Sequence, residues 1–369
     1  MPSAIVVGAG IFGASLARHL ARGGWQVTLV DKDRPGHERG ASGDASRLIR
    51  SAHGPDRWYA RSARRARDLW LELGEDSGSR LFEQVGLAWL ARSAKGWEAE
   101  SERALRDEGI PVERLDPEAG RELFPSFDPE GLEFILLEPE AGVLRARDAL
   151  HAVVAQAESA GAQLVLGEAR PAAEEVEIDG ERRSADVVVW ACGAWLAGLF
   201  PELAEIRVTR QDILYFGAGP EWGTPPVPAW VEYDSAFYGL GDLDGRGVKV
   251  APDSEGPPFD PDEDDRAHSA GSEAAARRFA ASRFPDLADA QLAGARVCPY
   301  ALTADTNFVI ARHPEHDRVW ILGGGSGHGF KHGPALAEYV VGVLEGETPD
   351  PRFGLGPREP GGSLRTAGT

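Results

Sequence analysis

Apolar and polar residues follow strand and helix periods along much of the chain. Residues 4–7 form a short apolar run, and an Ala/Leu/Arg-rich stretch with apolar positions at helical spacing comes soon after it. A second β-rich run, residues 27–30, ends on Asp31. Between the first run and the helical stretch lies Gly8-Ala9-Gly10-Ile11-Phe12-Gly13. A strand, a glycine turn, a helix and a second strand within about thirty residues predict a βαβ unit.

The same periodicities predict further elements. Helices are expected over 55–73 (stopped by Gly74), 97–107, 116–123 (closed by Pro125) and 142–161 (stopped by Gly161). Strands are expected within 80–91, over 163–166 and in the run "ADVVVWACGAW". Residues 206–296 alternate between strands, prolines and acidic loops, of which "GPPFDPDEDDR" is expected to be a solvated loop. The segment "RVWILGGGSGHGFKHGPALAEYVVGVLEG" returns to strand, glycine loop and helix.

This order of elements indicates an α/β protein with two domains. A chain of 369 residues exceeds the usual size of one hydrophobic core. We expect a discontinuous, Rossmann-like nucleotide-binding domain from residues 1–80, 145–205 and 297–356. Residues 81–144 and 206–296 would form a substrate domain around an antiparallel sheet, and 357–369 a poorly ordered tail.

Composition excludes several classes of partner. The net charge of −20 argues against nucleic acid and anionic membranes, although a local basic pocket can still bind an anionic small molecule. No apolar run is long enough to cross a bilayer, and no signal-peptide segment precedes the first strand. Two cysteines provide no disulfide framework. We therefore expect a soluble, cytoplasmic enzyme, either a monomer or a small homo-oligomer.

The glycine turn has the spacing of a dinucleotide site. Gly8 permits the tight turn, Gly10 lets a pyrophosphate approach the backbone, and Gly13 lets helix and strand pack closely. Asp31 follows Gly13 by 18 residues, where a carboxylate can bind an adenosine ribose and disfavour a 2′-phosphate. The alternative is a glycine-rich turn in an ordinary α/β protein. The turn predicts a dinucleotide without identifying it.

Three further segments accompany this fingerprint: "GASGDASRLIRSAHG", "GRGVKV" and "CPYALTADTNFVIARHPEHDRVWILGGGSGHGFK". Together the four segments resemble the flavin-dependent amine oxidases of the D-amino-acid oxidase superfamily, in particular the monomeric sarcosine oxidase and N-methyltryptophan oxidase group. The resemblance implies FAD as cofactor and a Rossmann-like FAD-binding domain. It also implies oxidation of an amino acid or N-substituted amino acid to an imine, with molecular oxygen reduced to hydrogen peroxide.

The resemblance also implies roles for five side chains. Arg50 and Lys331 match the pair that binds the substrate carboxylate, and an arginine fork with an ammonium suits that task. Tyr300 matches an active-site tyrosine, Lys249 the lysine that helps reduced flavin react with oxygen, and Arg47 an arginine near the flavin. The alternatives are a surface salt bridge for Arg50, a lysine beside a helix for Lys331, core packing for Tyr300, a strand-edge lysine for Lys249 and loop stabilisation for Arg47.

A cofactor-binding set follows from the same resemblance. Its members are Gly8, Gly10, Ile11, Phe12, Gly13, Asp31, Ser42, Arg47, Cys298, Gly325, Gly327, His328, Gly329 and Lys331. Cys298 matches a cysteine that sarcosine oxidase bonds through sulfur to its flavin, which requires a thiol that ionises readily. The alternative is a buried free thiol, an interpretation that suits Cys192 within its apolar run.

Departures from the family pattern leave the substrate open. Asp253 stands where sarcosine oxidase has a histidine, and it would favour a more basic or hydroxylated substrate side chain if it lines the site. Ser42 and Gly43 replace a histidine pair. No histidine–carboxylate spacing suggests a metal site; His328 is expected to shape the glycine loop, and His313, His316 and His332 to be solvated.

Three other functions fit part of the pattern. One is a flavin dehydrogenase that passes electrons to a carrier, against which Lys249 weighs. Another is a flavin- or nucleotide-binding module without catalysis, which retention of Arg50, Tyr300 and Lys331 argues against. An NAD-linked dehydrogenase would share the glycine turn but would not explain the Cys-Pro-Tyr segment.

Overall fold

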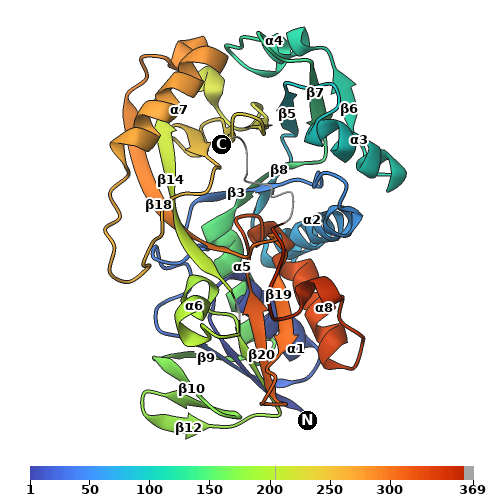
Figure 1. Cartoon of the computed structure of the whole chain (residues 1–369), viewed down its shortest axis with the longest axis vertical. Helices are drawn as coiled ribbons and strands as arrows, with labels where there is room; N and C mark the ends of the chain where they lie inside the picture. Colours follow the sequence, from blue (N-terminus) through green and yellow to red (C-terminus); the bar gives the residue numbers. More distant parts are fainter. Residues whose placement is uncertain (204, 361–369) are drawn as a thin grey trace.

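The computed structural model describes residues 1–203 and 205–360, and its lower half in Figure 1 is built on a six-stranded sheet. In spatial order the strands are β19 (Val309–Arg312), β20 (Val319–Gly323), β13 (Val187–Trp190), β1 (Ser3–Val7), β2 (Gln26–Asp31) and β9 (Gln163–Leu166). All neighbours are parallel except β19, which runs antiparallel to β20. Strands buried on both faces explain the apolar runs at β1 and β13.

Helices cover one face of this sheet. They are α1 (Ile11–Arg22), α5 (Ala146–Ser159) and α8 (Gly333–Leu344), with α2 (Arg57–Ser77) packed against α5 and α8. A three-stranded ribbon, β10 (Ala169–Ala172), β11 (Glu175–Ile178) and β12 (Glu181–Arg183), contributes to the core on the other side, where Val176 and Ile178 pack with Val7 and Trp190.

The upper half of the molecule in Figure 1 holds an eight-stranded sheet. Its strands, in spatial order, are β18 (Leu292–Leu302), β14 (Arg207–Phe216), β17 (Val248–Pro252), β16 (Phe237–Leu240), β15 (Ala229–Glu232), β5 (Leu87–Ala91), β7 (Phe134–Glu138) and β6 (Glu113–Leu115). The sheet is antiparallel except between β15 and β5. Helix α7 (Ala270–Arg283) packs on it through Phe279, whose ring stacks 5.1 Å from that of Trp230.

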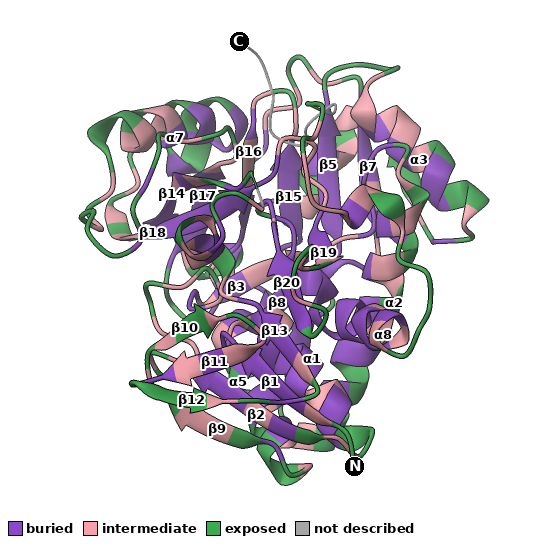
Figure 2. Ribbon diagram, turned by 60° about the horizontal axis from the view of Figure 1, so that its bottom comes forward, coloured by how far each residue is buried: buried purple, intermediate pink, exposed green. Residues whose placement is uncertain are grey.

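A small sheet lies between these halves (Figure 1). It pairs β3 (Ser46–Ile49) and β4 (Phe82–Glu83) with β8 (Gly142–Arg145). The remaining helices are α3 (Trp97–Asp107), α4 (Gly120–Leu123), α6 (Leu196–Leu199), η1 (Pro117–Ala119), η2 (Gly193–Trp195), η3 (Pro220–Trp222), η4 (Pro285–Leu287), η5 (Phe330–His332) and η6 (Pro351–Phe353). Figure 2 shows buried residues concentrated along the strands of both large sheets. The predicted α/β class with a second, largely antiparallel sheet is confirmed.

Two helix boundaries differ from those predicted. Helix α2 passes through Gly74 to Ser77 and ends at Gly78, whose φ of 64° lets its N–H donate to the carbonyl of Glu75 and the N–H of Ser79 to that of Gly74. Residues 142–145 form strand β8 rather than helix, because they pair with β3 and β4, and α5 begins only at Ala146.

Two further expectations concern the membrane and the tail. Among residues 1–203 and 205–360, no helix is both long and apolar enough to cross a membrane. Most of the expected tail, residues 361–369, lies outside the described residues. Arg358, which belongs to its first part, pairs with Asp305 and donates to the carbonyls of Asn307, Phe308 and Gly354.

Candidate active site

The glycine turn after β1 is shaped by close backbone packing. Gly8 has a φ of 104°, and a Cβ there would lie 2.5 Å from the carbonyl oxygen of Ala191. A Cβ on Gly13 would lie 1.9 Å from the carbonyl oxygen of Gly8, so α1 touches the turn directly. A Cβ on Gly10 would meet only Ser42 Oγ, at 3.4 Å, among the described residues. The space before the N-terminus of α1 is therefore open to a ligand.

That space belongs to a cavity of about 410 Å³, which we call the larger cavity. Its lining extends from the glycine turn and Asp31 to Arg47 on β3 and to Cys298 and Tyr300 on β18. The cofactor-binding residues expected from the sequence that line it are Gly8, Gly10, Ile11, Phe12, Asp31, Ser42, Arg47, Cys298, Gly325, Gly327 and Gly329. Gly13, His328 and Lys331 do not line it: Gly13 packs behind the turn, and the other two face a second cavity.

Two carboxylates shape this cavity. Asp31 accepts a 2.6 Å hydrogen bond from the N–H of Ala9 and so ties β2 to the glycine turn, while burial raises the pKa of Asp31. Asp262 comes from the acidic loop expected to be solvated, yet it lines the cavity and accepts 2.7 Å bonds from Lys32 Nζ and Trp195 Nε1. The many acidic residues of this loop did not indicate that Asp262 lines the cavity.

A second space of about 70 Å³, the smaller cavity, adjoins the first and shares Arg47, Tyr300, Gly327 and Phe330 with it. It is lined by cationic and aromatic side chains and one carboxylate. These are Arg47, Arg50, Lys249, Lys331, Trp89, Tyr233, Tyr238, Tyr300, Phe330 and Asp253. A cavity with this lining suits an anionic, partly apolar small molecule.

Arg50 and Lys331 reach the smaller cavity from different elements. Arg50 follows β3, donates to the carbonyl of Ala52 and holds its guanidinium 5.1 Å from the ring centroid of Trp89. Lys331 lies in η5, is 3% exposed and donates a 2.9 Å bond to the carbonyl of His328. The structure thus brings together two cations that stand 281 residues apart in the sequence (331 − 50).

Lys249 lies in β17, inside the eight-stranded sheet, and is 1% exposed, so it is not an edge lysine kept for solubility. Its Nζ lies 3.3 Å from Asp44 Oδ2. Asp44 also contacts Arg47 at 2.5 Å and Arg296 at 3.6 Å. Burial opposes the charged form of Asp44, but the cations Lys249 and Arg47 outweigh burial and hold the pKa of Asp44 well below its usual range. The negative charge of Asp44 thereby compensates the positive charges of Lys249, Arg47 and Arg296 where little water is present.

The sequence did not single out Asp44, Tyr215 or Tyr238. The Tyr215 hydroxyl donates to Asp44 at 3.3 Å, and Tyr238 is hydrogen-bonded to Tyr300. Burial raises the pKa of Tyr238 well above its usual value. In the sequence, only the short spacing between Asp44 and Arg47 could have indicated Asp44. Nothing could have indicated the two tyrosines, because they belong to strands distant in sequence.

Cys298 lies in the larger cavity next to a cation. Its Sγ is 3.6 Å from Arg47 Nη2 and its side chain is 5% exposed. Burial raises the pKa of the thiol, while the positive charge of Arg47 acts in the opposite direction. Cys192 also lines this cavity, but it donates to the carbonyl of Val7 at 3.4 Å.

The expectation that His332 is solvated is wrong. Its side chain is fully buried, because η5 packs against α2, where Trp70 donates to the carbonyl of Lys331. His328 is 5% exposed, whereas His313 and His316 are half-buried.

A Rossmann-like turn, an open space at a helix N-terminus and an adjoining charged cavity define an oxidoreductase that holds a dinucleotide next to its substrate. The chain belongs to the family described as "FAD dependent oxidoreductase" (DAO), whose profile matches residues 3–342.

Its relatives cover nearly the whole chain. Monomeric sarcosine oxidase of Streptomyces avermitilis is 31% identical over 366 residues, covering 94% of each chain, and that of Bacillus sp. (strain B-0618) is 29% identical over 353 residues, covering 91% of this chain and 90% of the relative. Among solved structures, iminodiacetate oxidase from Chelativorans sp. BNC1 has a TM-score of 0.79 at 26% identity, covering 94% of this chain and 96% of that one. L-proline dehydrogenase from P. horikoshii shares the fold with a TM-score of 0.85 at 22% identity, covering 94% of each chain.

Proposed function

We propose that this protein is an FAD-dependent oxidase of an amino acid or N-substituted amino acid, which forms an imine and hydrogen peroxide. The observation that carries the proposal is the pair of cations, Arg50 and Lys331, in a small aromatic cavity next to the larger one. FAD, when bound in the larger cavity, supplies the acceptor for a hydride equivalent from the carbon next to the amine.

Arg50 and Lys331 bind the substrate carboxylate and so fix the orientation of its α-carbon. A planar guanidinium and a compact ammonium are complementary donors for one carboxylate. The stacking of Arg50 on Trp89 restricts the guanidinium before the substrate arrives. The aromatic lining from Tyr233, Tyr238 and Tyr300 excludes water and strengthens the charge-assisted bonds.

The same cations favour the neutral form of the substrate amine. Arg47, Arg50, Lys249 and Lys331 line the smaller cavity, and nearby positive charge lowers the pKa of an amine. A neutral amine carries the lone pair that oxidation to an imine requires. Asp253 is the carboxylate of this lining, and we assign it to the substrate side chain, where it would accept from a basic or hydroxyl group.

Lys249 supports reaction with oxygen rather than with a protein carrier. Held by Asp44 and Ser46 at 3.3 and 3.4 Å, its ammonium is a fixed positive charge in the lining of the smaller cavity. Such a charge stabilises negative charge that develops on oxygen during its reduction.

The oxidase proposal is tested by two measurements on the FAD-loaded protein. Peroxide release is followed across a panel of primary and secondary amino acids, and the anaerobically reduced protein is mixed with oxygen or with an electron-accepting dye. We expect substrate-dependent peroxide and fast reaction with oxygen. Reduction by an amino acid followed by rapid reaction with the dye only would identify a dehydrogenase, and reduction by no amine would reject both.

Cys298 is proposed as the site of covalent attachment of FAD. The thiol lines the larger cavity, and Arg47 Nη2, 3.6 Å away, favours the thiolate. After acid precipitation, yellow colour should remain in the pellet of the wild type and of Cys192→Ala, and be lost from that of Cys298→Ala. Colour entirely in the wild-type supernatant would show that the bond does not form.

A further inference from the structure

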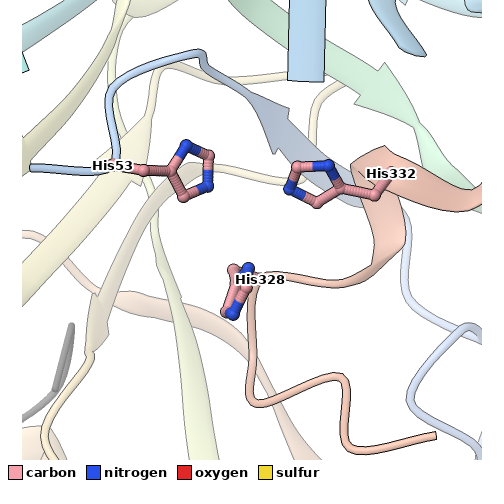
Figure 3. Close-up of side chains that lie close together, drawn as sticks. All are labelled: His53, His328 and His332. Atoms are coloured by element: carbon pink, nitrogen blue, oxygen red, sulfur yellow. The ribbon is translucent and has the colours of Figure 1, made fainter. Parts of the chain in front are cut away.

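Three buried histidines face one another beside the smaller cavity. His53 lies in the segment between β3 and α2, His328 in the glycine loop after β20, and His332 in η5. One nitrogen from each lies within 4.8 Å of those of the other two. Figure 3 shows His53 and His332 pointing a ring nitrogen toward the space between them, with His328 below that space. The three segments are brought together only by the fold.

The second nitrogen of each ring is bound to a protein oxygen. His53 Nδ1 lies 2.9 Å from the carbonyl of Ser51, and His328 Nε2 lies 3.0 Å from the carbonyl of Thr306. His332 Nδ1 lies 2.9 Å from the Ser62 hydroxyl. A carbonyl oxygen only accepts, so His53 and His328 carry a hydrogen on these outer nitrogens, and in the neutral ring the other nitrogen carries a lone pair.

The inner nitrogens of His53 and His332 have no partner among the described residues. Both Nε2 atoms are buried and unbonded there. Burial first, and the charge of Lys331 next, lower the pKa of both rings well below the usual value. A neutral imidazole whose outer N–H is held by a carbonyl or hydroxyl is the arrangement found in histidine metal ligands.

We propose that His53, His328 and His332 form a binding site for a divalent transition-metal ion, of which Zn²⁺ is the first to test. Three imidazoles without thiolate suit Zn²⁺, Cu²⁺ and Ni²⁺ rather than Mg²⁺ or Ca²⁺. Metal–nitrogen bonds of about 2.0–2.1 Å require the inner nitrogens to approach to about 3.4 Å, which is a small inward rotation of the rings. A tetrahedral ion would keep one position for water or another ligand.

The surroundings of the triad bear on its affinity. The rings of Tyr59 and Phe308 pack against His328 at 5.0 and 5.1 Å and limit access of water. Lys331 and Arg50 place positive charge nearby, which opposes a dication. Glu138 accepts bonds from the N–H groups of Ser51 and Ala52, beside His53, and balances part of that charge. We therefore expect reversible binding that is weaker than in a closed structural zinc site.

A bound ion would act on the smaller cavity through the backbone. His328 lines that cavity and His332 directly follows Lys331, so the ion would join the glycine loop and η5 to the segment before α2. This would fix the position of the Lys331 ammonium.

The test uses the untagged, FAD-loaded full chain after dialysis against a chelator. Zn²⁺ is titrated by calorimetry, and Co²⁺ is followed by its visible bands. We expect one ion per chain, with binding at least about 100-fold weaker in His332→Ala and His53→Gln. Ser62→Ala removes only the outer partner of His332 and should weaken binding by about tenfold without loss of the fold.

Two further variants separate this site from other histidines and from a purely structural triad. His313→Ala/His316→Ala removes the other close histidine pair, whose ring centroids are 4.5 Å apart, and should leave the affinity unchanged. Lys331→Met removes a like charge and should tighten Zn²⁺ binding by about tenfold. Absence of stoichiometric binding, or binding that is lost only in the His313/His316 variant, would overturn the proposal and leave the triad as a site for a buried water.

Discussion

The larger and smaller cavities share Arg47, Tyr300, Gly327 and Phe330, yet they are formed in opposite ways. The larger cavity opens where side chains are missing: a glycine turn, a helix N-terminus and a glycine loop. The smaller cavity is lined by charged side chains: Arg47 on β3, Arg50 just after it, Lys249 on β17 and Lys331 in η5. The shape of the larger cavity is therefore determined mainly by steric room, and that of the smaller cavity by compensation of charge.

Because of this difference, we expect mutations in the two cavities to have different consequences. A side chain added at the glycine turn collides with backbone, which has no rotamer to change, so the cost falls on folding and cofactor binding. A charge removed from the smaller cavity leaves partners such as Asp44 with other cations, so the fold should survive while the chemistry changes.

The largest effect is expected from Gly13→Ala. The new Cβ would lie 1.9 Å from the carbonyl oxygen of Gly8, so α1 must move away from β1. We expect a loss of about 3 kcal/mol or more in unfolding free energy and loss of tight FAD binding. Urea unfolding and FAD titration measure the two effects. Gly294→Ala, where a Cβ meets nothing within 4 Å, is the matched control, and equal stability of the two variants would contradict the close contact.

Lys249→Met should separate the two half-reactions. The ammonium is lost, but Asp44 retains Arg47 and the Tyr215 hydroxyl, so the fold and FAD content should be preserved. Reaction of the reduced enzyme with oxygen should slow by about 100-fold, or about 2.7 kcal/mol, and anaerobic reduction by substrate by less than about tenfold.

Stopped-flow measurement of each half-reaction provides the check, and Lys249→Arg, which keeps the charge, should recover part of the rate with oxygen. Equal losses in both half-reactions would mean that Lys249 positions the substrate or supports the structure instead.

Glu98, on α3, gives the stability of the protein a dependence on pH. Burial raises its pKa to about 7, with Asp234 and Glu232 adding to the effect, while its Oε1 has no hydrogen-bond partner among the described residues. The folded state thus favours the protonated carboxyl, and stability falls as the pH rises from the unfolded value, about 4.5, to about 7.

In Glu98→Gln this dependence should disappear. Between pH 5 and pH 8 the wild type should lose about 2 kcal/mol relative to the variant, measured by urea unfolding at each pH. Glu100→Gln changes a side chain on the same helix that is 44% exposed, and it should follow the wild type. If Glu98→Gln also follows the wild type, Glu98 is ionised in the folded protein without cost.

The two cavities also differ in how far the sequence could predict them. The glycine turn was predictable because its residues are adjacent and its conformation is local: Gly8 has the positive φ, and Gly13 the contact, that the spacing indicates. Arg50, Lys249, Tyr300 and Lys331 were identified only by resemblance, since no local pattern indicates that η5 and β17 meet. Their placement around one cavity is new information from the fold.

Tertiary pairing explains what the sequence missed. Residues 142–145 directly precede the helical sequence of α5, but they pair with β3 and β4 in a sheet. His53 stands 275 residues before His328 (328 − 53), so no ligand spacing could indicate the three histidines. Asp262 sits in an acidic loop, where composition correctly predicts solvation for most residues and cannot single out the one that bonds to Lys32 and Trp195.

The smallest effect, and the finest test of the comparison, is Lys331→Met. A charge-assisted hydrogen bond contributes about 1.5–3 kcal/mol, so a simple carboxylate such as propionate should bind more weakly by about tenfold or more, as measured by the change in flavin absorption. Lys32→Met is the control because Lys32 lines the larger cavity and pairs with Asp262, so it should leave propionate binding unchanged.

Propionamide, which has the same shape without the charge, should bind both variants and the wild type alike. An unchanged dissociation constant for propionate in Lys331→Met would show that Arg50 alone holds the carboxylate, and a loss in Lys32→Met would show that the ligand binds in the larger cavity instead.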